Sequence, residues 1–168
     1  MKSLLEVLNS IQDSRSEGIK RFYIDHKELM HKAPGSSGNH QAWEGGYADH
    51  IAEVMRIATH MYSSLGDYRS LPFSLESALI VLYFHDVEKI WKYTNQVDID
   101  KESFYAETLK RDYNIEFDSE EINALEYVHG ENEHYTNKGR VMNPLAAFCH
   151  TIDVISARIW FDGGKGSA

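Results

Sequence analysis

The sequence predicts an all-α fold. Apolar residues recur at steps of three and four along nearly the whole 168-residue chain, which is the spacing that places side chains on one face of a helix. The long loop signals fall at 33–39 and 130–143, and no repeat or low-complexity tract divides the sequence. A chain of this length can bury one hydrophobic core. We therefore expect a single helical domain over residues 1–162 and a disordered tail at 163–168.

The first predicted helix spans about Ser3 to Lys32, with Gly18 as the point at which it bends or divides. Its apolar stripe offers a surface on which two copies of the chain could pair, so a homodimer is one expectation. The stripe consists of Leu4, Leu8 and Ile11.

The later helices are predicted from apolar spacing and from residues that suit helix ends. In chain order they span about 45–64, 72–89, 101–112, 119–128 and 144–160. Pro72 and Pro144 each suit a first helical turn, and the acidic start of the 119–128 segment favours the helix dipole. Weak strand-like patterns occur at 97–99 and 115–117. The total is a bundle of about six to seven helices.

The composition excludes several classes of protein. The single cysteine, Cys149, cannot form an intramolecular disulfide or a zinc cage of thiolates. The longest apolar run, 78–84, is too short to cross a bilayer, and residues 1–9 lack the core of a signal peptide, so we expect a cytoplasmic protein without a membrane partner. A balance of 17 basic against 26 acidic residues argues against long duplex nucleic acid as a partner. Short nucleotides remain compatible if a metal ion supplies positive charge.

Histidine and aspartate stand where the pattern predicts the core. The 78–84 segment is apolar on every side, and His85-Asp86 follows it directly. A buried carboxylate needs a cation, a metal ion or many hydrogen bonds. In the last helix His150 and Asp153 are three apart and share a face, and His50 faces inward from the 45–64 helix.

Two interpretations of these residues stay open on spacing alone. A lone histidine on an apolar stripe is more often a hydrogen-bonded core residue than a metal ligand. Neutral imidazole and carboxylate are, however, the ligands that Zn, Mn, Fe, Co and Ni accept, and a shared ion would resolve the burial of the whole set.

The order of these residues resembles the HD-domain superfamily of metal-dependent phosphohydrolases, whose pattern is H…HD…D. The matching residues are His50, His85, Asp86 and Asp153, and the similarity covers about Ala33 to Arg158. The double glycine at 45–46 and the Asp-x-x-Ser-Ala-Arg ending at 153–158 also look like this family, and 39–46 resembles the lead-in of HD-domain 3′–5′ exoribonucleases. Small stand-alone proteins of this kind occur among phage-encoded HD hydrolases. The resemblance implies an HD-type helical bundle.

The resemblance also implies roles for individual residues. It implies that the four matching residues are metal ligands and that Asp86 and Asp153 are also catalytic. It implies one or two divalent metal ions as the cofactor, of Mn, Zn, Fe, Co, Ni or Mg. His129 and His134 become candidates for a second metal ion, and Glu88 a candidate catalytic acid or base. The candidate substrate-binding residues are Lys89, Arg56, Arg158, Trp43, Tyr47, His40 and His150.

The expected activity is hydrolysis of a phosphomonoester or phosphodiester in a nucleotide or short oligonucleotide, so the expected partner is a small phosphorylated molecule. Two alternatives remain. The histidine count permits a di-iron oxygenase of HD type, and an HD scaffold can also serve as a non-catalytic nucleotide-binding module.

Overall fold

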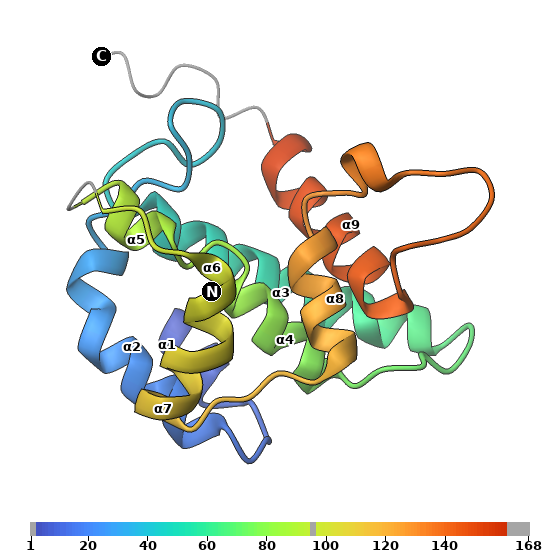
Figure 1. The fold of residues 1–168 in the computed structure, drawn as a ribbon, viewed down its shortest axis with the longest axis horizontal. Coiled ribbons are helices and arrows are strands. Elements are labelled where there is room, and N and C mark those ends of the chain that lie inside the picture. The colour runs from blue at the N-terminus through green and yellow to red at the C-terminus, as the bar shows by residue number, and fades with distance from the viewer. Residues whose placement is uncertain (1–2, 95–96, 161–168) are drawn as a thin grey trace.

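The computed structural model describes residues 3–94 and 97–160, and the tail predicted at 163–168 lies outside them. The all-α prediction is confirmed: over the described ranges there is no strand, and the β-type pairing is an isolated bridge between Thr136 and Gly139. The helices are α1 (Leu4–Leu8), α2 (Ser16–Met30), α3 (Gly46–Gly66), α4 (Leu75–Phe84), α5 (Lys89–Lys92), α6 (Lys101–Ser103), the π-helical η1 (Phe104–Thr108), α7 (Leu109–Tyr113), α8 (Ser119–Tyr127), the 3₁₀ turn η2 (Asn132–His134) and α9 (Pro144–Arg158) (Figure 1).

Helix α4 is the centre of the core. Its residues 78–84 are all buried, as their unbroken apolar run predicts, and α4 packs against α3, α8 and α9. In Figure 1, α1, α2 and α7 lie on one side of α4, and α8 and α9 lie on the other. The residues that follow α4, His85 and Asp86, therefore lie in the interior.

The chain turns sharply at the end of α4. The sequence predicts one helix from Pro72 to residue 89, but α4 begins at Leu75, where Ser74 accepts a hydrogen bond from the backbone of Ser77, and it ends at Phe84. Residues 85–88 then form a turn, with backbone bonds from Val87 to the Phe84 carbonyl and from residue 89 to the residue 86 carbonyl. The turn lets both 85 and 86 face the same point, which a continuing helix would not do.

The N-terminal segment divides before Gly18 and not at it. Helix α1 ends at Leu8 and α2 begins at Ser16, whose hydroxyl donates to the carbonyls of residues 11 and 13. Gly18 lies inside α2, where a Cβ atom would meet the Tyr113 carbonyl oxygen at 2.1 Å. This glycine permits close packing of α2 against α7, and the prediction of a bend there is wrong.

The stripe of Leu4, Leu8 and Ile11 is buried within the chain itself, because α1 packs against α3. It offers no surface for pairing two copies, so the expected homodimer loses this basis and stays an untested prediction.

The other predicted segments agree to different degrees. The segments at 119–128 and 144–160 form α8 and α9 within two residues of the expected ends. The 101–112 segment is helical but consists of α6, η1 and α7, with a π turn in the middle. The patches at 97–99 and 115–117 are not strands. Among the described residues, no helix has both the length and the apolar character that crossing a bilayer requires.

Candidate metal centre

Three elements bring the four predicted ligands together. His50 comes from the second turn of α3, His85 and Asp86 come from the turn after α4, and Asp153 comes from α9. His50 Nε2 lies 3.4 Å from His85 Nε2, and Asp153 Oδ1 lies 3.2 Å from the first and 3.5 Å from the second. The helices that carry them are joined by direct packing of α3, α4 and α9.

Asp86 lies beside the two histidines of this group. Its Oδ2 atom lies 3.4 Å from His85 Nε2 and 3.8 Å from His50 Nε2. Ligands bound at about 2.1 Å to one ion, at angles between octahedral and tetrahedral, are separated by about 3.0–3.4 Å. The donor atoms of His50, His85 and Asp153 thus stand close to the spacing that a single divalent cation requires, whereas Asp86 groups with His85 and His129 and not with Asp153. Imidazoles with carboxylates suit Zn, Mn, Fe, Co or Ni.

Hydrogen bonds on the outer side of each imidazole set the inward-facing nitrogen. His85 Nδ1 lies 2.7 Å from the Leu82 carbonyl oxygen, which can only accept, so Nδ1 carries a proton and Nε2 faces the centre. His50 Nδ1 lies 3.1 Å from Ser156 Oγ, and that hydroxyl donates to Glu53 Oε2 at 2.6 Å. His50 therefore presents Nε2 in the same way.

Glu53 and Ser156 are site residues whose role the sequence does not predict. Glu53 also accepts a hydrogen bond from Gln41 Nε2 at 2.8 Å, which ties the 33–45 loop to the support of His50. Each stands three positions after a ligand, Glu53 after His50 and Ser156 after Asp153, on the same helix face. A polar residue three places beyond a buried ligand is the signal that could have found them.

The two carboxylates are held in the ionised form. Burial alone would raise the pKa of Asp86, but His85, His129 and Lys89 outweigh it and hold that pKa well below the usual range. Burial likewise opposes ionisation of Asp153, yet hydrogen bonds from His50 and His85 lower its pKa. Both side chains therefore keep their negative charge in a dry setting.

The two buried histidines differ in their electrostatics. Burial lowers the pKa of His50, and its bond to Asp153 only partly offsets this. For His85, burial also acts to lower the pKa, but the charges of Asp86 and Asp153 prevail and the pKa is raised. His50 is accordingly deprotonated more readily than His85.

Lys89 lies against the centre. Its Nζ atom donates to Asp86 Oδ2 at 2.5 Å and to the Gly35 carbonyl at 2.9 Å, so it links a ligand to the 33–45 loop. Glu88 points to another partner: its Oε1 atom pairs with Lys101 Nζ at 2.8 Å. No described contact joins Glu88 to the four ligands, so its predicted catalytic role gains no geometric support.

His129 joins the edge of the centre and His134 does not. His129 Nε2 lies 3.3 Å from Asp86 Oδ1, a buried oxygen without a hydrogen bond of good geometry in the described residues, and His85, Asp86 and His129 form a second group of three that could hold an ion. His134 Nδ1 instead faces the Tyr127 hydroxyl at 3.1 Å, and His134 belongs to neither group of candidate ligands found among the described residues.

Two further predicted histidines lie nearby. The His40 ring stands 5.2 Å from the His50 ring, centroid to centroid, and its Nε2 atom is buried without a hydrogen-bond partner among the described residues. Burial, followed by the charges of His50 and Lys89, lowers the pKa of His40. His150 Nδ1 bonds the Val128 carbonyl at 2.7 Å and so anchors the backbone next to His129.

The remaining substrate-binding predictions fare less well. Tyr47 is completely buried, so its ring has no free face for a substrate and its predicted role in substrate binding is not compatible with the structure. The Trp43 indole donates to Asp49 Oδ2 at 2.8 Å. Arg56 is half-buried on α3, and Arg158 is exposed as the last residue of α9. No distance places these last three at the centre.

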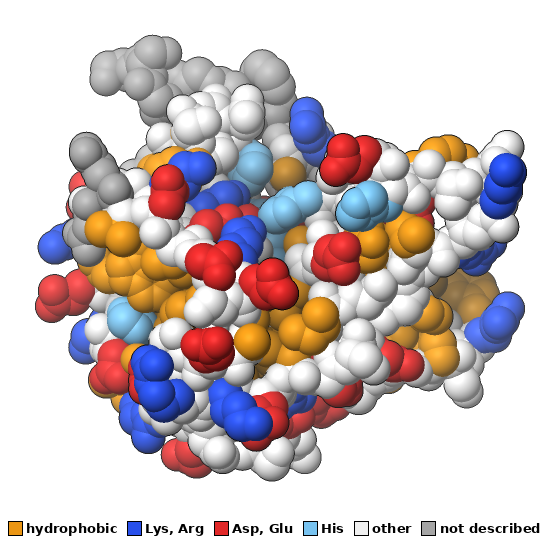
Figure 2. Space-filling model, in the orientation of Figure 1, with side chains coloured by type: hydrophobic (Ala, Val, Ile, Leu, Met, Phe, Trp, Pro, Cys, Tyr) orange, Lys and Arg blue, Asp and Glu red, His pale blue; other side chains and the backbone are white. Residues whose placement is uncertain are grey.

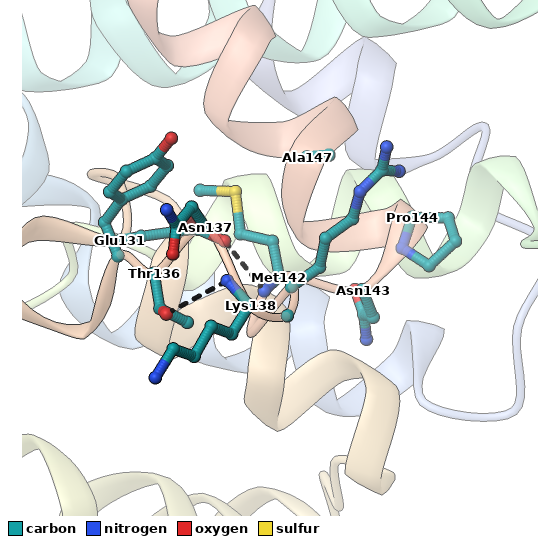
Figure 3. A pocket seen from close by; sticks show the side chains of 11 residues that line it. Glu131, Thr136, Asn137, Lys138, Met142, Asn143, Pro144 and Ala147 are labelled. Atoms are coloured by element: carbon teal, nitrogen blue, oxygen red, sulfur yellow. Dashed lines mark hydrogen bonds between the residues drawn. The ribbon is translucent and has the colours of Figure 1, made fainter.

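A separate cavity of about 900 Å³ lies beneath the 130–143 loop (Figure 3). Figure 3 shows Thr136, Lys138 and Met142 around it, with hydrogen bonds inside the loop from the Lys138 backbone to Thr136 and from the Met142 backbone to Glu131. None of the four candidate ligands lines it, so it is distinct from the centre.

Histidine side chains gather near the middle of one face of the molecule, beside acidic and basic side chains (Figure 2). Among the residues of the two candidate ligand groups, His129 is the exposed one, and His50 and His85 are buried. No family model matches the chain, and comparisons with curated proteins and with solved structures likewise gave no significant match.

Proposed function

We propose that this protein is a divalent-metal-dependent phosphohydrolase of the HD type, acting on a nucleotide or a short oligonucleotide. The observation that carries the proposal is the convergence of donor atoms from His50, His85 and Asp153 at separations of 3.2–3.5 Å, with Asp86 beside the two histidines at 3.4 and 3.8 Å. Both imidazoles have Nε2 directed inward, and both carboxylates are held ionised. A purely structural cluster has no need of these three features together.

A divalent cation held by these residues would stabilise charge on phosphoryl oxygens and promote the ionisation of water near neutral pH. The chain's own groups then bind and orient. Asp153, whose side chain is 12% exposed while that of His50 is fully buried, would accept a hydrogen bond from an attacking water. Asp86 faces His129 with its second oxygen.

Lys89 and His40 supply the remaining polar atoms. Lys89 Nζ has three donors, and the described contacts with Asp86 and Gly35 use two of them. The third donor suits a phosphoryl oxygen. His40 Nε2, buried without a described partner, suits a second phosphoryl oxygen on the side of His50.

A dinuclear oxygenase is the second candidate, and the group of His85, Asp86 and His129 favours it. His134, which such a centre would recruit, pairs with Tyr127 instead. Lys89, a cation beside the ligands, favours phosphate chemistry.

The test combines metal analysis with a phosphate-release panel on one preparation of the whole chain. Deoxynucleoside triphosphates, nucleoside monophosphates, cyclic nucleotides and short RNA are offered with Mn, Co and Ni. We expect release from at least one class, and loss of both metal and release in Asp86→Ala but not in Asp67→Asn, an exposed control at the end of α3.

Activity that is absent throughout, or equal in wild type and Asp86→Ala, contradicts the proposal. Iron as isolated together with oxygen uptake under Fe(II) favours the oxygenase. Tight nucleotide binding without any product favours a non-catalytic module.

A further inference from the structure

A groove opens between the α6–η1 segment and α8, beside the candidate metal centre. It encloses about 700 Å³, within the range of about 300–1,000 Å³ typical of small-molecule sites. We call it the α6–α8 groove. Its lining residues are Lys101, Glu102, Tyr105, Ala106, Ile122, Leu125, Glu126 and His129.

The groove adjoins the centre through His129 and Lys101. His129 lines the groove and also stands 3.3 Å from Asp86 Oδ1. Lys101 lines it too, and its Nζ atom lies 3.4 Å from the His85 carbonyl oxygen. A molecule that reaches the centre past His129 therefore has this groove as its adjoining space.

The floor of the groove is apolar. Ile122 and Leu125 stand three positions apart on one face of α8, and Ile122 is 43% exposed although it is a large apolar residue. His129 lies in the turn that follows the helix. On the opposite wall the Tyr105 hydroxyl donates to the Phe84 carbonyl at 2.8 Å, which leaves the ring as a fixed apolar surface. Figure 2 shows apolar and acidic surfaces adjoining the histidines on this face.

The charges at the rim select against an extended phosphate chain. Two carboxylates, Glu102 and Glu126, line the groove against one ammonium, and that ammonium already pairs with Glu88 at 2.8 Å. A di- or triphosphate extending into the groove would meet net negative charge. An uncharged group with N–H and O–H donors would find apolar surface beneath it and carboxylate acceptors beside it.

The π turn in η1 shapes the same wall. The wider turn at 104–108 displaces side chains from regular α-helical register, and π turns inside helices occur frequently at functional sites. Tyr105 and Ala106, which face the groove, both lie within it.

We propose that the α6–α8 groove binds the uncharged part of the substrate, a nucleoside-sized cyclic group bearing hydrogen-bond donors, while a single phosphoryl group lies at the centre formed by His50, His85, Asp86 and Asp153. This inference rests on the proposed function. It adds that nucleoside monophosphates bind better than triphosphates that carry the same base.

The first test fills the groove. Ala106→Trp, at an exposed position in η1, is compared with Glu107→Trp, the same new side chain one residue outside the groove lining, after circular dichroism confirms that both are folded. With Mn²⁺ and deoxyadenosine 5′-monophosphate, we expect KM to rise at least ten-fold in Ala106→Trp and to stay within two-fold of wild type in Glu107→Trp. Equal KM values in the two variants overturn the inference.

The second test reads binding without turnover. Methyl-labelled protein with Mg²⁺ is titrated with adenosine 5′-monophosphate, and we expect NMR shifts at Ile122 and Leu125 but not at Ile24, an exposed isoleucine on α2. Shifts at the groove without any phosphate release support the groove and contradict the phosphohydrolase. If the groove residues show no shifts, with or without phosphate release, the inference about the groove is overturned. The proposed function is then decided by the phosphate-release panel alone.

Discussion

At the scale of single residues, the orientation of His50 depends on one buried hydroxyl group. Ser156 is completely buried between the His50 imidazole and the Glu53 carboxylate, and it bonds both. Removing it would leave a buried imidazole N–H and a carboxylate oxygen each short of a partner. The orientation of His50, a candidate metal ligand, thus depends on Ser156, which is not itself a candidate ligand.

Ser156→Ala is expected to weaken Mn²⁺ or Zn²⁺ binding by about 10- to 100-fold, because His50 loses the bond that fixes its tautomer and ring. Kd is measured by competition with a chelator of known affinity. Thr151→Ala, which removes an exposed hydroxyl from the same helix, is the matched control and should bind metal as wild type does. An unchanged Kd in Ser156→Ala would show that His50 is oriented by packing alone.

His40→Asn is expected to lower phosphate release by roughly ten- to hundred-fold while metal content stays unchanged, since His40 Nε2 is placed to contact the substrate and not the ion. Release and metal content are measured on the same sample. His60→Asn, a change at an exposed histidine late in α3, is the control. Loss of metal in His40→Asn would instead assign this residue to the ligand set.

The sequence predicts the site residues whose chemistry is unusual for their position. It does not predict those whose role depends on tertiary packing. His85 and Asp86 stand out because a carboxylate after a fully apolar helix demands compensation. Tyr47 reads from sequence as an aromatic residue near the site, and only packing shows that its ring is sealed. Glu53 reads as an ordinary charge on α3, and its role depends on Ser156, 103 positions further along the chain.

At the scale of elements, the start of α3 fixes the 33–45 loop against the centre. Gly45 has φ +81°, in the left-handed region, and a Cβ atom on Gly46 would meet the Gln41 carbonyl oxygen at 1.8 Å. Gln41 itself takes φ +39°, which is strained for a residue with a side chain. The double glycine therefore serves close approach of the loop, which carries His40, to the helix, which carries His50.

Gly46→Ala is expected to destabilise the fold by about 1–3 kcal/mol, because the added methyl forces the loop backbone away from α3. Urea unfolding followed by circular dichroism measures this. Gly38→Ala, in the same loop but with open space around its Cβ, should change stability far less. Equal stability of the two variants would mean that the loop shifts freely, and that its contact with α3 is not needed.

Helix ends were predicted well where a local residue decides them and poorly where a distant one does. Asn143 caps α9 and Asp118 caps α8, and both helices begin where the sequence predicts. The break between α1 and α2 is instead held by Arg15, which binds Glu121 from α8 through its two terminal nitrogens, Nη1 and Nη2. No local pattern around Gly18 could reveal a partner 106 positions away.

At the scale of the whole molecule, the centre couples stability to pH. The folded-state pKa values of Asp86 and Asp153 lie below their ordinary value of 3.8, so both carboxylates contribute stability above that value and lose it as the pH falls toward the lower folded-state pKa values. Near neutral pH the histidines oppose each other, since the pKa of His50 is lowered and that of His85 is raised.

In metal-free protein, the free energy of unfolding should therefore fall steeply between about pH 5 and pH 3. The slope should be shallower in Asp153→Asn, which has lost one of the two carboxylates, and unchanged in Asp67→Asn. Urea titrations at half-unit pH steps measure it. Parallel curves for wild type and Asp153→Asn would contradict the assignment of a low pKa to this residue.

Lys89 gives Asp86 a positively charged partner that is part of the chain. The carboxylate is neutralised as soon as α5 forms beside the turn after α4, so the fold does not depend on any ion arriving first. A cation bound by Asp86 would compete with this tethered ammonium. A monovalent cation would only match the charge of the ammonium, whereas a divalent cation would exceed it. We therefore expect Lys89 to favour divalent over monovalent cations at Asp86.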